Sequence, residues 1–338
     1  MTGKTRISAE VDFDKDGKQQ GFFRLPHSVH RSAYGWIGIP IIVIRNGSGP
    51  TVLLSAGNHG DEYEGQIALM KLCQELQPEA VNGRIIITTA TNYPAVISGT
   101  RTSPIDDGNL NRAFPGDPNG TPTFAIAHYF ESELLSRADY MLDLHSGGSS
   151  LMYIPSALAQ RSDDAEIESK QIEMVKAFGA SISYFAGSTK ATGDDRTALA
   201  GAARQGVAAI GTELGGSGSA SVFSVHVAEQ GVRRVLKHLG VVPQIRHEPA
   251  PELTRLMEVP GLDYYTYSPD FGIWEPLADL GDEVKQGQPA AAIYSPETPW
   301  RQPITTHFSR DGLVICRRVP GRVHRGDCLF HLATDFAG

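Results

Sequence analysis

Over residues 50–240, short continuous apolar runs alternate with segments in which apolar residues recur at helical spacing. Short continuous apolar runs bounded by turn residues are typical of strands buried inside a parallel sheet. Such runs predict strands at 51–56, 84–90, 140–145, 181–185 and 207–214. Between them apolar residues recur at helical spacing, which predicts helices at 64–76, 122–137, 164–178, 195–205 and 220–239. This alternation predicts an α/β fold in which helices flank a mixed sheet.

A further apolar run, at 37–45, precedes the first of these strands, and residues 1–34 suggest a short β extension before it. Asn46-Gly47 follows the run. Asn-Gly between two apolar runs is a strong signal for a β-hairpin. We therefore expect 37–45 and 51–56 to form adjacent antiparallel strands.

The pattern changes after residue 241. A polar stretch with Pro243, Pro249 and Pro251 is typical of a linker. Beyond it no helical period is found, and short β runs alternate with Gly and Pro. The pattern predicts four parts: an N-terminal β extension (1–34), a main α/β domain (35–242), a linker (243–256) and a small C-terminal all-β domain (257–338).

Charge and cysteine content narrow the choice of partners and compartment. The formal net charge is -8 and the pI is near 5.8, whereas a nucleic-acid-binding protein would need a basic face. Cys73, Cys316 and Cys328 are far apart and odd in number, which favours a reducing cytoplasm without disulfides. No apolar run approaches the length of a membrane span, and no signal peptide is visible. We expect no nucleic-acid or membrane partner.

The first candidate metal ligands follow the strand predicted at 51–56. The turn after it carries His59 and Glu62 to the carboxyl edge of the sheet, where open α/β sheets bind ligands. A histidine and a carboxylate three residues apart can hold one metal ion, and a catalytic zinc usually has three protein ligands. The pair therefore predicts a third ligand elsewhere. The alternative is a helix start that Asn58 or Asp61 caps, with His59 at the surface.

His145 meets the demand for a third ligand. It ends the strand at 140–145, two residues after Asp143. Because alternate residues of a strand point to the same face, Asp143 could accept a hydrogen bond from His145 and orient its ring towards a metal. The alternative for His145 alone is a packed or capping histidine.

Glu213 closes the strand at 207–214 and enters a Gly-Gly turn. A metal hydrolase needs a base that takes a proton from water and returns it to the leaving nitrogen. Partial burial would raise the pKa of such a glutamate towards the useful range. The alternative is a buried glutamate paired with an arginine.

A long polar loop at 92–120 offers candidate substrate contacts, because loops of this length in a compact domain are usually functional. Asn111 and Arg112 could clamp a carboxylate with an amide and a guanidinium fork. Arg101 could stabilise a developing oxyanion. The alternative for each arginine is a surface ion pair.

Together these motifs resemble the zinc carboxypeptidase superfamily in its aspartoacylase and succinylglutamate desuccinylase branch. They are His59-Gly-Asp-Glu62, Asn111-Arg112, Asp143-Leu-His145 and Glu213. The resemblance covers about residues 35–335 and implies that 35–242 form a zinc-dependent catalytic domain. It implies one Zn²⁺ per chain, with these ligands: His59, Glu62 and His145.

The same resemblance implies roles for the other candidate residues. Glu213 would be the general base, and Arg101 would assist the carbonyl of the substrate. Asn111 and Arg112 would hold the substrate carboxylate. Arg204, nine residues before Glu213, is expected to face the substrate as well.

Within this branch the chain is most similar to bacterial Nα-acetyl-L-2,4-diaminobutyrate deacetylases of ectoine breakdown. The residues that carry this similarity are Val11-Asp-Phe-Asp-Lys-Asp-Gly17, Gly35-Trp-Ile-Gly-Ile-Pro-Ile41 and Asn58-His-Gly-Asp-Glu-Tyr-Glu-Gly65. The resemblance implies a homodimer that hydrolyses a small N-acylated amino acid to acetate and diaminobutyrate. Candidate partners for the substrate's ammonium are Asp106, Asp107, Asp194 and Asp195.

Three alternatives stay open. The chain could deacylate another N-acyl amino acid by the same mechanism, such as succinylglutamate or the substrate of aspartoacylase. It could hydrolyse peptides, although the C-terminal β domain could narrow the mouth of the site. It could also be a non-catalytic, zinc-dependent protein that binds small molecules, in which case Glu213 would not act as a base.

Overall fold

The computed structural model describes residues 5–187, 195–250 and 253–337. The strands before residue 240 are β1 (Ser8–Ala9), β2 (Gly17–Pro26), β3 (Trp36–Asn46), β4 (Thr51–Ala56), β5 (Gly83–Thr88), β6 (Tyr140–Leu144), β7 (Leu151–Tyr153), β8 (Ser156–Gln160), β9 (Ile182–Ala186) and β10 (Ala208–Glu213). The α-helices are α1 (Tyr63–Glu75), α2 (Tyr93–Ser98), α3 (Pro122–Tyr129), α4 (Ala165–Phe178), α6 (Ala198–Arg204) and α7 (Val222–His238). Short 3₁₀ turns are η1 (Pro78–Ala80), η2 (Leu110–Arg112) and η4 (Leu135–Arg137), and a π-helical turn, η3 (Phe130–Leu134), continues α3. The predicted helices and strands before residue 240 are found. A short apolar run from Leu151 to Ile154 also suggests a strand, which is β7, and α2 and β8 are added to the predicted elements.

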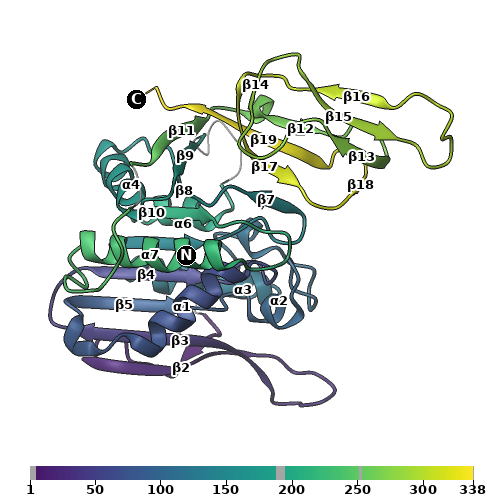
Figure 1. Ribbon diagram of the computed structural model, residues 1–338. Coiled ribbons are helices and arrows are strands. Elements are labelled where there is room, and N and C mark those ends of the chain that lie inside the picture. Colours follow the sequence, from purple (N-terminus) through teal and green to yellow (C-terminus); the bar gives the residue numbers. More distant parts are fainter. Residues whose placement is uncertain (1–4, 188–194, 251–252, 338) are drawn as a thin grey trace.

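The later part of the chain is made of strands and one 3₁₀ turn among its described residues. These elements are β11 (Arg255–Val259), η5 (Leu262–Tyr264), β12 (Tyr265–Tyr267), β13 (Gly272–Pro276), β14 (Glu283–Val284), β15 (Pro289–Tyr294), β16 (Ile304–His307), β17 (Gly312–Arg318), β18 (Arg322–Val323) and β19 (Cys328–Asp335). Figure 1 shows these strands gathered at one end of the molecule. The predicted fold class, a helix-flanked mixed sheet with a small all-β region after it, is confirmed.

A long mixed sheet connects the two regions, in the order β1-β2-β3-β5-β4-β6-β10-β8-β9-β11-β19-β17-β14. Strands β5, β4, β6 and β10 are parallel to one another. The second sheet is antiparallel, in the order β16-β15-β13-β18. Because β7 pairs with β17, and β11 with both β9 and β19, strands cross the predicted domain boundaries. The four-part division therefore stays a prediction.

The predicted hairpin between 37–45 and 51–56 is wrong. Strand β5 lies between β3 and β4, and Ile85 pairs with Ile44 on one side and Val52 on the other. The residues between β3 and β4 cross two strand spacings, about 10 Å, which a short extended segment can reach. The apolar run of β5 gains more burial inside the sheet than at its edge.

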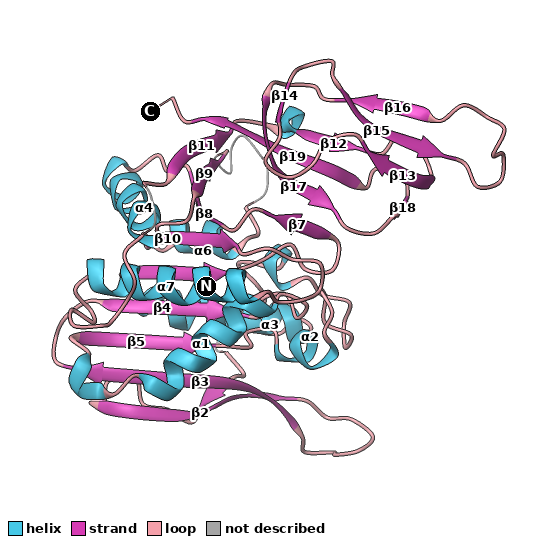
Figure 2. Ribbon diagram, viewed as in Figure 1, coloured by secondary structure: helices cyan, strands magenta, loops and turns pink. Residues whose placement is uncertain are grey.

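The central strands are buried on both faces, as their continuous apolar runs predict. Val52 and Leu54 of β4 belong to the core under α1, α4 and α7, while Leu53 belongs to the core under α3 and α6. Figure 2 shows α1 and α7 lying across one face of these strands. No helix in the part of the chain that the structure describes is long and apolar enough to cross a membrane.

Candidate metal centre

The ends of parallel strands bring the three candidate ligands together. Ala56 of β4 pairs with Leu144 of β6, so the segments that follow these strands leave the sheet at the same edge. His59 lies in the turn after β4, and His145 follows β6 directly. Glu62 occupies the position that would cap α1, but its side chain makes no capping hydrogen bond. Its carboxylate contacts the two histidines instead.

The carboxylate of Glu62 lies between the two imidazole rings. Its Oε1 is 2.7 Å from Nδ1 of His59, and its Oε2 is 2.9 Å from Nδ1 of His145. One ligand atom from each residue lies within 4.8 Å of the others, and the side chains of His59 and Glu62 are each 3% exposed. Two imidazole nitrogens and a carboxylate oxygen that converge in this way fit a metal ion with three protein ligands.

The second nitrogen of each histidine is held by an acceptor outside the cluster. His145 Nε2 donates to Asp143 Oδ2 at 2.8 Å, and His59 Nε2 donates to Asn109 Oδ1 at 3.1 Å. Asp143 also accepts from Ser55 Oγ. With the proton on Nε2, each Nδ1 would present a lone pair to a metal, which is how metal-binding histidines are usually oriented. Without a metal, both Nδ1 atoms lie at hydrogen-bond distance from the Glu62 carboxylate.

The charges of the cluster favour a cation. Although burial alone would raise it, the pKa of Glu62 is well below its usual value because His59 and His145 lie against the carboxylate. Burial would also raise the pKa of Asp143, but the charge of His145 lowers it. Burial lowers the pKa of His59. Two ionised carboxylates therefore face the histidines at neutral pH.

Glu213 ends β10 beside this cluster. Burial, followed by the negative charge of Glu62, raises the pKa of Glu213 to about 8. Its Oε2 is buried and has no hydrogen-bond partner among the described residues. The next residue, Leu214, donates its N–H to the carbonyl of His145 at 3.0 Å. The carboxyl is thus placed next to the ligands and can exchange a proton near neutral pH.

Arg101 of the long loop also reaches the cluster. Its Nη1 lies 3.3 Å from His59 Nδ1 and 3.5 Å from Glu62 Oε1. The side chain is 45% exposed. A guanidinium at this position borders the cluster on its solvent side, so it can meet a bound molecule.

Comparison with known proteins places this arrangement in a family. Residues 48–239 match the profile described as "Succinylglutamate desuccinylase/Aspartoacylase catalytic domain". This match covers more than half of the chain. The chain belongs to this family. Membership makes it a hydrolase of the deacylase type, which agrees with the His-Glu-His cluster.

Proteins that are similar to this chain over nearly its whole length belong to the same group of enzymes by their descriptions. The chain is 43% identical over 330 residues to an N-alpha-acetyl-L-2,4-diaminobutyric acid deacetylase of Halomonas elongata, covering 97% of this chain and 94% of that protein. The product-bound ectoine utilization protein EutE (DoeB) of Ruegeria pomeroyi is 40% identical with a TM-score of 0.92, over 98% of this chain and 99% of that one. A succinylglutamate desuccinylase/aspartoacylase from Rhodobacter sphaeroides is 39% identical with a TM-score of 0.91, over 98% and 100%.

Asn111 and Arg112, the expected carboxylate clamp of this family member, lie in η2. Asn111 Oδ1 accepts the N–H of Ala198 at 2.9 Å, which fixes the start of α6 and leaves the amide nitrogen for other contacts. Arg112 is exposed and donates Nη1 to the carbonyl of Asn111 at 2.7 Å. Their role in substrate binding stays a prediction.

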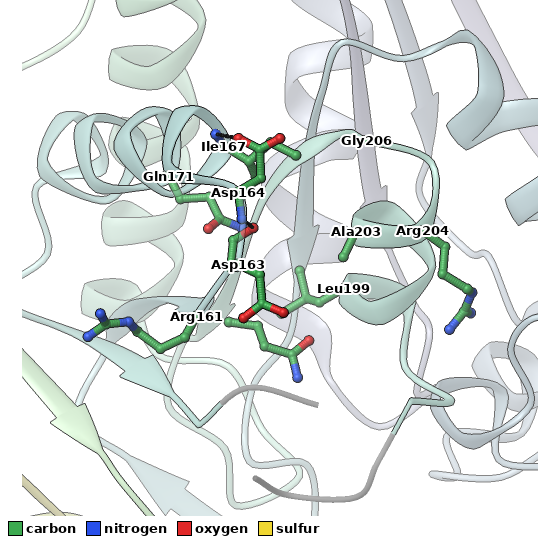
Figure 3. Close-up of a pocket in the computed structure, with 11 residues that line it drawn as sticks. Arg161, Asp163, Asp164, Ile167, Gln171, Leu199, Ala203, Arg204 and Gly206 are labelled. Carbon is green, nitrogen blue, oxygen red and sulfur yellow. Dashed lines mark hydrogen bonds between the residues drawn. The ribbon is translucent and has the colours of Figure 1, made fainter. Parts of the chain in front are cut away.

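Arg204 is not brought to the cluster. It forms a bidentate ion pair with Glu131, at 2.9 and 2.7 Å, and donates to the carbonyl of Asp195 at 2.6 Å. Figure 3 shows it at the wall of a cavity of about 400 Å³, together with Arg161 and Asp163. Gly206, which also lines the cavity, precedes β10, whereas Glu213 ends that strand. The expected substrate contact of Arg204 stays a prediction, and its described partners are structural.

Some residues of the site were not found from the sequence. Asn109, the partner of His59, belongs to the same polar loop as Asn111, but no spacing distinguishes it from the other asparagines there. Among the candidates for an ammonium partner, Asp106 accepts the N–H and hydroxyl of Thr123 at 2.8 and 2.7 Å, so its carboxylate is occupied. Asp107 and Asp195 are exposed, and Asp194 lies outside the described residues.

Proposed function

We propose that this protein hydrolyses Nα-acetyl-L-2,4-diaminobutyrate to acetate and L-2,4-diaminobutyrate, as a deacetylase of ectoine utilization. The observation that carries the proposal is the buried His59–Glu62–His145 cluster with Glu213 beside it. This cluster occurs in a chain 43% identical, over nearly its whole length, to a deacetylase of that substrate. The EutE (DoeB) structure, with a TM-score of 0.92, supports the same assignment.

We propose zinc as the metal, with one ion per chain. Two neutral imidazole nitrogens and one carboxylate, with a position left for water or substrate, are the donor set of many catalytic zinc sites. When bound, the ion would lower the pKa of a water molecule and polarise the acyl carbonyl. The Nε2 hydrogen bonds of His59 and His145 keep the Nδ1 atoms in position for it.

Glu213 moves the proton in this reaction. Its carboxylate takes a proton from the attacking water as the oxygen of that water bonds to the acetyl carbon. It then gives the proton to the departing α-nitrogen as the carbon–nitrogen bond breaks, which leaves acetate and a free amine. Arg101, next to His59, donates to the acyl oxygen while negative charge develops there.

Asn111 and Arg112 hold the α-carboxylate of the substrate in this proposal. An amide N–H and a planar guanidinium can bind both oxygens of a carboxylate. The position of these residues in the same loop as Arg101 supports this role. The homodimer and the cytoplasmic location that the sequence suggests stay predictions.

A substrate panel tests the proposal. Acetate release is measured from Nα-acetyl-diaminobutyrate, Nγ-acetyl-diaminobutyrate and N-acetylaspartate, and succinate release from succinylglutamate, each with a chelator control. We expect chelator-sensitive turnover with a preference for the first compound. Equal turnover of N-acetylaspartate would contradict the substrate assignment but keep the mechanism. Turnover that survives complete removal of metal would contradict the mechanism.

A further inference from the structure

Asp61 is a buried carboxylate that the proposed reaction does not use. It is 4% exposed and lies between His59 and Glu62 in the sequence. Its Oδ2 accepts the N–H of Ser149 at 2.8 Å and the hydroxyl of Ser149 at 2.6 Å. Ser149 lies four residues after His145. The carboxylate therefore joins the turn that carries two of the candidate ligands to the loop that follows the third.

This loop, residues 146–149, is bonded to the same turn at its other end. Ser146 donates its N–H to Glu62 Oε2 at 3.2 Å. Two consecutive residues, Asp61 and Glu62, thus accept hydrogen bonds from the first and the last residue of the 146–149 loop. The backbone of the loop is thereby fixed against the turn that carries the ligands.

The 146–149 loop also holds the turn after Glu213 by backbone hydrogen bonds. Gly147 donates its N–H to the carbonyl of Gly215 at 3.0 Å. Gly218 donates its N–H to the carbonyl of Gly148 at 2.8 Å. The loop therefore lies between the carboxylate and this turn and is bonded to both.

Gly148 allows the carboxylate to come this close. Its φ of 55° is in the left-handed region, which glycine adopts more readily than residues with a side chain. A Cβ at Gly148 would lie 2.8 Å from Asp61 Oδ2. A side chain at this position would therefore displace the carboxylate from Ser149.

Capping of helix α1 does not account for Asp61. The capping position is Glu62, and no side-chain hydrogen bond caps the helix there. Among the described residues, both hydrogen bonds of the Asp61 carboxylate go to Ser149, and its buried Oδ1 has no partner. A buried carboxylate costs free energy unless it is hydrogen-bonded. Here the bonds that offset this cost go to the loop and not to the helix.

We propose that Asp61 is a positioning residue that holds the 146–149 loop, and through it Glu62 and the turn after Glu213, in the geometry that hydrolysis needs. The inference rests on the proposed function, in which Glu62 is a metal ligand and Glu213 moves the proton. Without the carboxylate, the N–H and the hydroxyl of Ser149 lose their acceptor. The loop is then held at one end only and gains freedom to move.

Three variants and a control test this role. Asp61→Ala removes the acceptor, Asp61→Asn keeps an oxygen that can accept from Ser149, and Ser149→Ala removes only the hydroxyl donor. The control is Asp139→Ala. Asp139 Oδ2 accepts the N–H of Thr51 at 2.7 Å, also across 88 positions of sequence, but at the start of β4.

Hydrogen exchange of residues 146–149 and 215–218 is measured on the metal-free protein, and kcat and KM are measured with one zinc ion bound per chain. In Asp61→Ala we expect exchange about tenfold faster and kcat about 30-fold lower. KM should stay within about threefold, and Asp61→Asn should recover most of kcat. Ser149→Ala should give smaller changes of the same kind, and Asp139→Ala should change neither the exchange nor kcat.

Each result separates one explanation from the others. Unchanged exchange in Asp61→Ala would show that the carboxylate does not hold the loop. Faster exchange with unchanged kcat would overturn the positioning role, and a loss of kcat that Asp61→Asn does not recover would contradict the role of the hydrogen bonds to Ser149. If Asp61→Ala does not fold, the exchange and kcat of Ser149→Ala decide the same questions. If the wild-type protein were inactive, the proposed function would fail, while hydrogen exchange would still decide whether Asp61 holds the loop.

Discussion

The His59–Glu62–His145 cluster and the surroundings of His331 show two different ways to bury a histidine. His331, on β19, is 3% exposed and stacks on Tyr265, with 4.1 Å between the ring centroids. Tyr153 and Tyr184 contact it edge-on at 6.0 and 5.9 Å. Neither ring nitrogen has a hydrogen-bond partner among the described residues. Burial lowers the pKa of His331 to about 3, so the ring is neutral and serves as an aromatic side chain.

The metal centre differs in how its nitrogens are used. Each Nε2 has an acceptor, Asp143 or Asn109, while the Nδ1 atoms of His59 and His145 converge on one carboxylate. Burial is common to both places and therefore does not identify function. What distinguishes the metal centre is an orienting hydrogen bond on one nitrogen of each ring and a second nitrogen directed at the carboxylate that both rings share. Substitutions that break one arrangement and leave the other intact test this distinction.

The largest effect is expected from Glu213→Gln. The amide keeps the size of the side chain but cannot take a proton from water, so kcat should fall about 1,000-fold while bound metal stays the same. Steady-state kinetics and metal analysis on the same sample measure both quantities. Glu131→Gln, at the buried carboxylate that pairs with Arg204, is the matched control and should keep most of the activity. Full activity in Glu213→Gln would remove this residue from the mechanism.

His331→Phe should change stability with pH and leave turnover at neutral pH nearly unchanged. His331 is neutral in the folded protein down to about pH 3, whereas in the unfolded chain its pKa is about 6.5. The unfolded state therefore binds the extra proton, and wild-type stability is lost as pH falls from about 6.5 towards 3. Between pH 7 and pH 4 the variant should avoid a loss of about 3 kcal/mol.

Denaturant unfolding across this pH range measures the effect of His331→Phe. His307→Phe, at an exposed histidine of β16, is the control for adding a phenylalanine to the same region. Parallel stability curves for the wild type and His331→Phe would contradict the neutral, unpartnered ring. A loss of metal binding in His331→Phe would contradict the separation of the two clusters.

Asp143→Asn should lower the affinity of the centre for metal. The amide oxygen can still accept from His145 Nε2, but the negative charge that supports the imidazole is lost. Loss of such a partner typically costs 10- to 100-fold in metal affinity or activity, and we expect about 30-fold in metal affinity. Competition with a metal-binding dye measures it, with Asp164→Asn as the control. An unchanged affinity would show that the negative charge of Asp143 does not contribute to metal binding.

The smallest effect is expected from Arg204→Lys. Lysine keeps the charge beside Glu131 but not the bidentate contact, so stability should fall slightly while KM stays within about threefold. Initial rates over a range of substrate concentrations measure KM. A large increase in KM with unchanged stability would support the prediction that Arg204 contacts the substrate.

The sequence predicted the parts of this protein that depend on local pattern. The continuous apolar runs of β4 and β6 identified buried strands, and parallel pairing then brought His59 and His145 to one edge. The burial of Glu213 was also predicted from local pattern, because a carboxylate at the end of an apolar strand cannot reach bulk water easily.

The parts that were missed depend on long-range pairing. The Asn-Gly signal after β3 predicted a hairpin, but the chain places β5 between β3 and β4, which no local pattern records. Asn109 contacts His59 across 50 positions of sequence. Arg204 precedes Glu213 by nine residues, but the whole of β10 lies between them, so its side chain does not reach the cluster and its contact with the substrate stays a prediction.

The dependence of turnover on bound metal tests the central claim most directly. Metal-free protein is prepared with a chelator, zinc is added in steps, and the rate of acetate release from Nα-acetyl-diaminobutyrate is plotted against the metal bound per chain. Because the cluster offers one set of three ligands, the rate should rise in proportion to bound zinc and level off at one ion per chain. Full activity without metal, or a rate that does not follow occupancy, would contradict the assignment of His59, Glu62 and His145 as the catalytic centre.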